Sequence, residues 1–182
     1  GITQSTIPKT KNGLGWIFSV VMGVIVLASF IFFAVRYKTL GLAGVLSQLI
    51  AIVIFMYFAG LVFIPMFNIF AAIGVALAYL FMTFFTVFTF EKIRKYSESK
   101  TFNASMYKGF ADTLKVNLIA HAAFLVLGIV LWVIPTAVTA PLGCVMVYGA
   151  VLSFAATFGL NRLFSLMVAP FNESTAKVSA KK

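Results

Sequence analysis

The chain has 182 residues, of which 62% are hydrophobic and only 10% are charged. A soluble domain has about a quarter of its residues charged, so this composition excludes an ordinary water-soluble globular protein. The formal net charge is +10. The basic residues nevertheless lie in short connecting segments and at the chain ends and form no basic face, which excludes a nucleic-acid-binding protein. Cys144 is the only cysteine, so the sequence holds no disulfide framework and no cysteine-based metal cluster.

Residues 1–13 form a polar segment that begins at Gly1. The segment has no initiator methionine and lacks the basic, apolar and small-residue zones of a signal peptide. We therefore expect it to be an external segment that continues from the upstream region of a longer protein.

Five apolar runs follow, and each approaches or exceeds the length of about 20 residues that a membrane-spanning helix needs. They lie at about 14–35, 40–63, 67–90, 116–133 and 142–168. Pro65 separates the second run from the third, and Pro135 and Pro141 bracket the turn before the fifth, as expected where helices end. The long runs do not alternate in polarity, which excludes a membrane β-barrel. The sequence thus predicts an all-α integral membrane protein, a bundle of five transmembrane helices within residues 14–168.

The one sizeable connection between spans is residues 91–115. Its apolar side chains recur every four positions and are Phe102, Met106, Phe110 and Leu114. This spacing predicts a short amphipathic helix in the cytoplasmic interface, the alternative being a polar loop with scattered apolar residues. Residues 169–182 are polar and basic, and we expect a disordered cytoplasmic tail.

The basic residues predict the orientation of the spans. Twelve of the fourteen fall on one side of a five-span arrangement, namely Arg36, Lys38, Lys92, Arg94, Lys95, Lys100, Lys108, Lys115, Arg162, Lys177, Lys181 and Lys182. Cytoplasmic loops carry an excess of lysine and arginine. We therefore expect a multi-pass protein of the plasma membrane, with the N-terminus of this chain outside and its C-terminus in the cytoplasm.

Ionisable residues inside membrane spans are by default functional candidates. All four acidic residues, Glu91, Glu98, Asp112 and Glu173, lie outside the predicted spans. His121 is the one titratable group expected at depth, and Asn117 precedes it by one helical turn. Two hypotheses follow: a proton relay through His121, or a neutral imidazole that hydrogen-bonds to a neighbouring helix with the help of Asn117.

Two further patterns indicate helix packing. Small residues recur every four positions at Gly149, Ser153 and Thr157, and also at Gly74 and Ala78. Hydroxyls recur at Thr83, Thr86 and Thr89, where they either bond back to their own helix or line a substrate path. The sequence shows no nucleophile–base pair, no metal cluster and no glycine-rich phosphate loop, so we expect a protein that is not an enzyme and that holds no cofactor or metal.

Several short motifs occur in a fixed order along the spans. They are Arg36-Tyr37, Gly41-Leu42-Ala43, Phe90-Glu91-Lys92-Ile93-Arg94, Gly109-Phe110, Gly149 with Ser153, and Asn161-Arg162-Leu163. Their order and spacing, over roughly residues 33–164, resemble the C-terminal membrane region of SecD in the SecD/SecF protein-export machinery. That resemblance implies half of an RND-type membrane domain with five helices that begin outside, in agreement with the orientation expected from the charges.

The chain departs from that family at two positions. The family carries Asp-x-Asn sequences, associated with proton coupling, in the third and fourth of these helices. The matching positions here are Phe84 with Thr86 and Ile119 with His121, so both carboxylates are missing. The family's first helix and its large external domain are also missing from this sequence.

The resemblance implies an accessory subunit of the Sec translocon that assists release of exported polypeptides on the outer side. The implied partners are the translocon channel, a second SecF-like half, the exported chain and the lipid bilayer. Two alternatives stay open: a membrane component of a vitamin-type importer, with a pocket drawn from Gln48, Asn68, Thr83 and His121, or a structural membrane anchor. The candidate functional positions are His121, Asn117, Thr86, Glu91, Arg94, Ser153 and Arg162.

Overall fold

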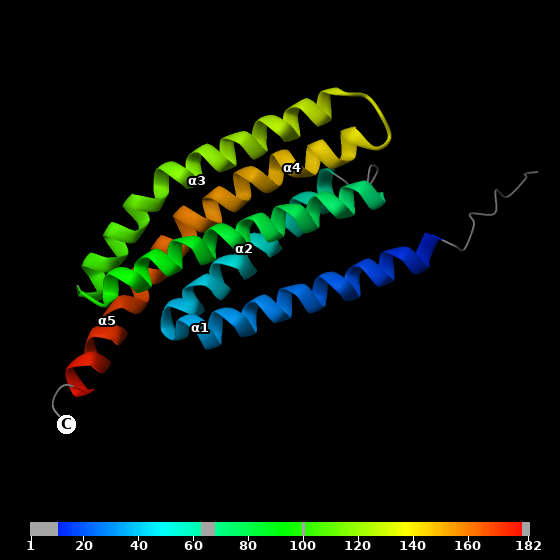
Figure 1. The fold of residues 1–182 in the computed structure, drawn as a ribbon. Helices are drawn as coiled ribbons and strands as arrows, with labels where there is room; N and C mark the ends of the chain where they lie inside the picture. Colours follow the sequence, from blue (N-terminus) through cyan, green and yellow to red (C-terminus); the bar gives the residue numbers. More distant parts are fainter. Residues whose placement is uncertain (1–10, 63–67, 100, 180–182) are drawn as a thin grey trace, which may run out of the picture.

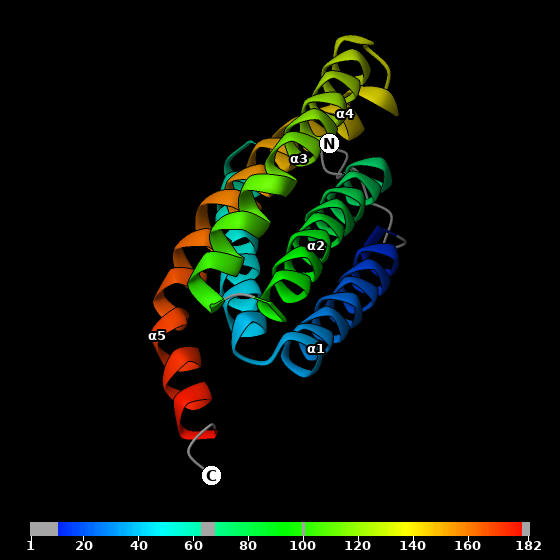
Figure 2. The same ribbon diagram turned by 60° about the vertical axis from the view of Figure 1, so that its left-hand side comes forward.

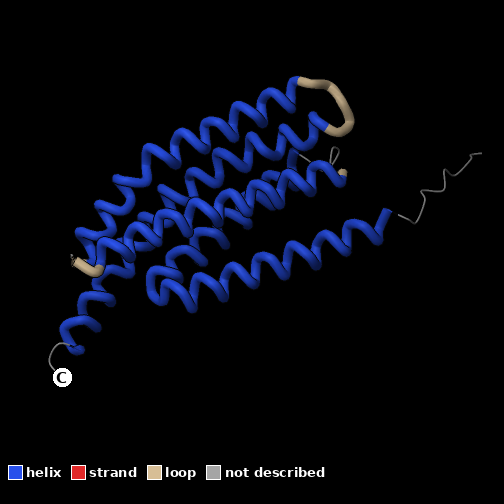
Figure 3. Tube along the Cα trace, viewed as in Figure 1, coloured by secondary structure: helices blue, strands red, loops and turns tan. Residues whose placement is uncertain are grey.

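The computed structural model describes residues 11–62, 68–99 and 101–179, and the regular elements in these ranges are all helices. Residues 1–10 of the expected external segment, and Pro65, lie outside the described residues. The helices are α1 (Lys11–Val62), α2 (Ile69–Ser97), α3 (Phe102–Val133), α4 (Thr139–Phe154), the π-helical segment η2 (Ala155–Leu160) and α5 (Asn161–Ser179). Figure 3 shows short turns between α2 and α3 and between α3 and α4.

Four helical stretches are long and apolar enough to cross a membrane. They are Gly15–Phe58, Ile69–Ser97, Phe102–Val133 and Thr139–Pro170, the last of which runs through α4, η2 and α5. Helices satisfy all their backbone hydrogen bonds internally, which is what the hydrocarbon core demands. The structure therefore indicates a multi-pass membrane protein with four candidate spans, whereas the sequence predicted five. The difference lies in α1, which contains the first two predicted spans.

Within α1 the backbone breaks at Lys38, whose φ of 51° and ψ of −121° are not helical. Figures 1 and 2 show α1 turning back on itself at this end of the bundle. We call residues 11–37 the first arm and residues 39–62 the second arm. Gly41 allows the turn to be tight, because a Cβ added there would lie 1.9 Å from the carbonyl oxygen of Phe33. The break falls at the connection that the sequence predicted between the first two spans.

Helix α4 packs closely against both α2 and α3. A Cβ added to Gly149 would lie 2.4 Å from the Cβ of Ala78 on α2, and one added to Gly143 would lie 2.3 Å from the backbone nitrogen of Trp132 on α3. Small residues at such positions let helix backbones approach, which is the main packing device available in lipid. The predicted packing role of Gly149 and Ala78 is confirmed.

The turns at the far end from Lys38 are built from capping side chains. Asn68 Oδ1 accepts hydrogen bonds from the backbone nitrogens of Phe70 and Ala71, both at 3.0 Å, and thereby caps α2. The same side chain donates to the carbonyl oxygen of Ala137 at 2.9 Å, which ties the start of α2 to the α3–α4 turn. Pro141 lies in the first turn of α4, where a missing N–H costs nothing.

Two segments differ from expectation. The predicted interfacial helix is not a separate element, because α3 runs unbroken from Phe102 to Val133. No proline interrupts that stretch, and Met106 and Phe110 are buried against other helices while Leu114 is exposed. Helix α5 continues to Ser179, into the segment that was expected to be disordered.

Candidate functional site

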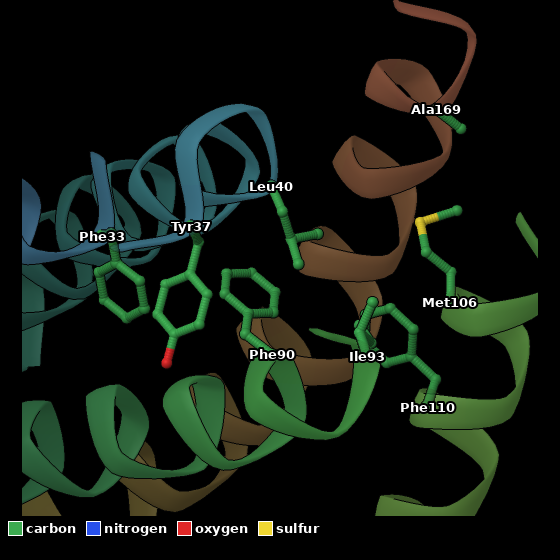
Figure 4. Packing of buried hydrophobic residues seen from close by; sticks show 8 residues of the cluster. All are labelled: Phe33, Tyr37, Leu40, Phe90, Ile93, Met106, Phe110 and Ala169. Atoms are coloured by element: carbon green, nitrogen blue, oxygen red, sulfur yellow. The ribbon is translucent and has the colours of Figure 1, made fainter. Parts of the chain in front are cut away.

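Four helices meet in a buried cluster beside the Lys38 turn, which we call the turn-side cluster. Figure 4 shows its members: Phe33, Tyr37, Leu40, Phe90, Ile93, Met106, Phe110 and Ala169. They come from both arms of α1 and from α2, α3 and α5. The Phe90 ring lies edge-on to Phe33, with ring centroids 5.9 Å apart, and 5.4 Å from the Tyr37 ring. Such aromatic contacts contribute more stabilisation than the burial of their apolar surface alone would give.

Glu91 lies at the edge of the turn-side cluster and joins α1 to α2. Its Oε1 is 3.1 Å from Arg36 Nη2, and its Oε2 is 3.0 Å from Arg94 Nη2. The Tyr37 hydroxyl donates to Oε1 at 2.9 Å. One carboxylate therefore holds two guanidinium groups and one phenol, and it fixes the end of the first arm against the end of α2.

Glycine brings α3 into the same cluster. A Cβ added to Gly109 would lie 2.5 Å from Ile93 Cγ1 and 3.1 Å from the Ile93 backbone. Any larger residue would push α3 away from α2 here. Residues of three of the short motifs, far apart in the sequence, thus meet at one end of the bundle.

His121 lies in the middle of the bundle, 4% exposed. Its Nδ1 is 2.8 Å from the carbonyl oxygen of Asn117, and its Nε2 is 2.9 Å from the Ser153 hydroxyl on α4. Because a carbonyl only accepts, Nδ1 carries the hydrogen, and in the neutral ring Nε2 accepts from Ser153. The hydrogen bond to a neighbouring helix that the second hypothesis for His121 requires is present.

Aromatic rings surround this imidazole. Phe81, Phe85 and Phe154 have ring centroids 4.8, 5.2 and 5.4 Å from that of His121. The described carboxylates lie elsewhere: Glu91 pairs with arginines, Asp112 bonds to Tyr96, and Glu98 is exposed just after the end of α2. The surroundings of His121 therefore contain hydroxyls, amides and rings, and no described acidic partner.

Asn161 organises a second polar group between the second arm, α2 and α5. The Ser47 hydroxyl donates to Asn161 Oδ1, and Asn161 Nδ2 donates to the Thr86 hydroxyl at 3.2 Å. All three residues are at most 1% exposed. Asn161 follows directly after η2. Single π-helical turns inside α-helices occur frequently at functional sites.

A third polar group connects both arms of α1 to α2. The Tyr79 hydroxyl bonds to Ser29 on the first arm and donates to Gln48 Oε1 on the second arm at 3.1 Å. Gln48 Nε2 donates to the Thr83 hydroxyl at 3.3 Å. The polar side-chain atoms of Gln48 and the hydroxyl of Thr83 are therefore hydrogen-bonded to other residues of the bundle.

The hydroxyl stripe on α2 is a helix-contact surface. Thr89 donates to the carbonyl oxygen of Phe85 at 2.9 Å, as expected for a hydroxyl bonded to its own helix, and lies 3.4 Å from the Thr113 hydroxyl on α3. Asn117 Nδ2 on α3 donates to the Thr89 hydroxyl at 3.5 Å. Thr86 accepts from Asn161 as described above, so the stripe faces partner helices along its length.

The predicted site residues thus divide among separate places. Glu91 and Arg94 lie at the turn-side cluster, whereas His121, Asn117 and Ser153 lie together in the middle of the bundle. Thr86 belongs to the Asn161 group. Arg162 is exposed and lies over the Tyr107 ring, 5.6 Å from its centroid. Within the described residues no group of three or more His, Cys, Asp or Glu side chains forms a metal site.

Sequence reasoning missed Asn161, Ser47, Ser29 and Tyr79 as network residues. Asn161 continues the four-residue spacing of Ser153 and Thr157, and Ser165 continues it further; all are buried. That spacing was a usable signal for Asn161 and Ser165. The partners of Ser29 and Ser47 depend on how the arms of α1 pack, which spacing alone does not give.

Phe84 and Ile119, the two positions that the resemblance to SecD sets against aspartates, point away from the bundle. Phe84 is 64% exposed and Ile119 is 60% exposed. Two residues after each, Thr86 and His121 are buried. Within this chain the buried middle is therefore lined by the second residue of each pair.

An apolar groove of about 460 Å³ separates the first arm from α2, α4 and the second arm. Among its lining residues, the polar ones are Ser19, Tyr79 and Ser153. This groove is not lined by the residues named for the pocket of a vitamin importer, Gln48, Asn68, Thr83 and His121. The side chains of Gln48 and His121 bond to Thr83 and Ser153 instead.

Comparisons of the chain with protein-family models, with curated proteins and with solved structures found no match.

Proposed function

We propose that the chain is an accessory membrane subunit of the Sec protein-export translocon, working beside the channel and a SecF-like half to assist release of exported chains. The observation that carries the proposal is the turn-side cluster. Residues of the motifs that resemble SecD, among them Tyr37, Glu91, Ile93 and Gly109, contact one another there although they come from three helices. If these motifs belong to one shared fold, they are expected to meet in this way.

The proposed topology has five membrane crossings. Each arm of α1 is long enough to span about 30 Å of hydrocarbon at 1.5 Å per residue, and α1 turns back between them at Lys38 (Figure 1). Five crossings place twelve of fourteen basic residues on one side. That side is the cytoplasm of a plasma-membrane protein, and the N-terminus of the chain lies outside.

The proposed role is passive in this half. A proton path needs groups that titrate, and the middle of the bundle offers His121 held between a carbonyl oxygen and a hydroxyl. We therefore assign His121 and Asn117 to helix packing, and any carboxylate for energy coupling to the SecF-like half.

The experiment is a pull-down of the native protein in mild detergent, with mass spectrometry of the retained proteins. Recovery of the translocon channel with a SecF-like chain is the expected result. Glu91→Ala should lower that recovery because it loosens the turn-side cluster. Glu98→Ala, at an exposed position just after the same helix, should leave it unchanged. Recovery of neither partner would contradict the proposal and favour a structural membrane anchor.

The apolar groove favours a second candidate, a transport component for an apolar small molecule. Pockets lined mainly by apolar side chains bury most of a small ligand's surface, and this groove fits that description. Co-purification of an ATPase pair or of an extractable metabolite in the same pull-down would replace the translocon proposal with this one.

A further inference from the structure

The first arm of α1 and the end of α2 border an open hollow of about 750 Å³, separate from the apolar groove. It is lined by Ala28, Ile31, Phe32, Val35, Arg36 and Arg94. The four apolar residues occupy positions i, i+3, i+4 and i+7, so they form one stripe along the first arm. Ile31 and Val35 are 64% and 76% exposed, so the stripe is not covered by this chain.

The two arginines close one end of the stripe, on the side that carries most of the basic residues. Both contact Glu91, yet their side chains remain 47% and 46% exposed. Two guanidinium groups and one carboxylate leave a net charge of +1. A guanidinium has five N–H donors, so Glu91 orients both groups and leaves donors that line the hollow.

We infer that this hollow binds one anionic phospholipid of the leaflet on the basic side. Arg36 and Arg94 hold the phosphate, and one acyl chain lies along Ala28, Ile31, Phe32 and Val35. Guanidinium forks match phosphate oxygens geometrically, and basic pockets at the ends of membrane helices recognise lipid headgroups. The inference does not depend on which proteins the chain accompanies.

The apolar stripe favours a lipid over a free phosphate ion as the ligand. Four exposed apolar residues directly beside the arginines add nothing to the binding of a small anion, but they bury the chain of a lipid whose phosphate the arginines hold. The charge complements an anionic headgroup and gives a zwitterionic lipid no comparable advantage.

The experiment uses the purified full chain in phosphatidylcholine nanodiscs that contain a minor fraction of phosphatidylglycerol. Native mass spectrometry then counts the lipids retained after mild delipidation. Each arginine near an anionic membrane surface contributes enough for about a five-fold change in affinity, so Arg36→Gln with Arg94→Gln should lower phosphatidylglycerol retention by about 25-fold. Lys108→Gln with Lys115→Gln removes the same charge from exposed positions of α3 and should change retention less than two-fold. Equal losses in the two pairs would overturn the inference.

Two further variants separate lipid binding from a structural role of the arginines. Glu91→Gln raises the net charge of the triad to +2, so retention of phosphatidylglycerol should hold or rise; a fall as large as in the arginine pair would show that the arginines serve Glu91 alone. Val35→Trp fills the apolar stripe and leaves all charges in place, so retention should fall. Unchanged retention in Val35→Trp, or displacement of the lipid by inorganic phosphate, would contradict a seated acyl chain.

Discussion

The two sides of the bundle are held together by different means. Where α4 meets α3, a Cβ on Gly143 would lie 2.3 Å from one backbone atom and 2.5 Å from the carbonyl oxygen of Gly128. Along the first arm of α1, in contrast, Gly15 and Gly23 have no atom within 4 Å of the same added Cβ. The same residue type thus marks backbone contact on one side and open surface on the other.

This difference follows from the solvent. In lipid no hydrophobic force drives helices together, so association depends on close backbone packing and on hydrogen bonds between helices. Helices α2, α3 and α4 use both. The first arm contacts the bundle through Met22, Ile25 and Val26, through the bond between Ser29 and Tyr79, and at its end through the turn-side cluster. The apolar groove lies between the remainder of this arm and the other helices. We expect the first arm to have the lowest local stability in the bundle.

Replacing Gly143 with valine should give the largest effect. Both nearest neighbours are backbone atoms, which cannot rotate aside, so the free energy of unfolding should fall by more than about 3 kcal/mol. The matched control is Gly23→Val on the first arm, which should change it by less than about 0.5 kcal/mol. Unfolding in mixed micelles with a rising fraction of denaturing detergent measures the free energy of unfolding of both variants. Equal losses would refute the contrast between the two sides.

The substitution Phe84→Asp tests whether position 84 faces lipid. Phe84 is exposed, so Phe84→Asp puts a carboxylate against lipid at a cost of about 2.5–3.5 kcal/mol. We expect reduced insertion and no gain in proton-driven export, with Phe84→Asn as the uncharged control. Export that became more dependent on the proton gradient in the Asp variant alone would contradict the passive role proposed for this half.

The turn at Lys38 stores backbone strain. A lysine with positive φ costs about 1–2 kcal/mol relative to glycine at such a position. Lys38→Gly should therefore be more stable than Lys38→Ala by about that amount, although both variants lose the same charge. Thermal unfolding of the two variants measures the difference. Equal stabilities would mean that the two arms do not meet in the turn described.

The bond between His121 and Ser153 should give the smallest effect. A double-mutant cycle of His121→Gln and Ser153→Ala should yield a coupling of about 0.6 kcal/mol, the usual size between membrane helices. Export should keep its dependence on pH in His121→Gln. A shifted pH profile with unchanged stability would restore the proton-relay hypothesis.

Much of the fold could be predicted from the sequence, because apolar length and charge act along the chain. The runs that became α2 and α4, the break near Lys38 and the turn at Pro135 all follow from local composition. The continuity of α3 did not follow. The spacing of apolar residues in its first turns predicted a separate amphipathic helix. In the structure Met106 and Phe110 of these turns are buried against α2 and α5.

The candidate site could be predicted only in part. His121 stood out because a titratable residue inside an apolar run is rare, and its partner Ser153 lies on a recognisable small-residue stripe. The pairings of Ser47 with Asn161 and of Ser29 with Tyr79 join residues from different helices. Such contacts depend on the crossing angles of the helices and on the turn within α1, which no local pattern in a single sequence encodes.

The most direct test of the proposed function is the release of a pulse-labelled secreted protein from spheroplasts, with and without this chain. We predict that depletion of the chain slows the step from membrane-engaged to released polypeptide, that the wild-type gene restores the rate, and that Glu91→Ala does so incompletely. Release at the wild-type rate in depleted cells would contradict a role in export.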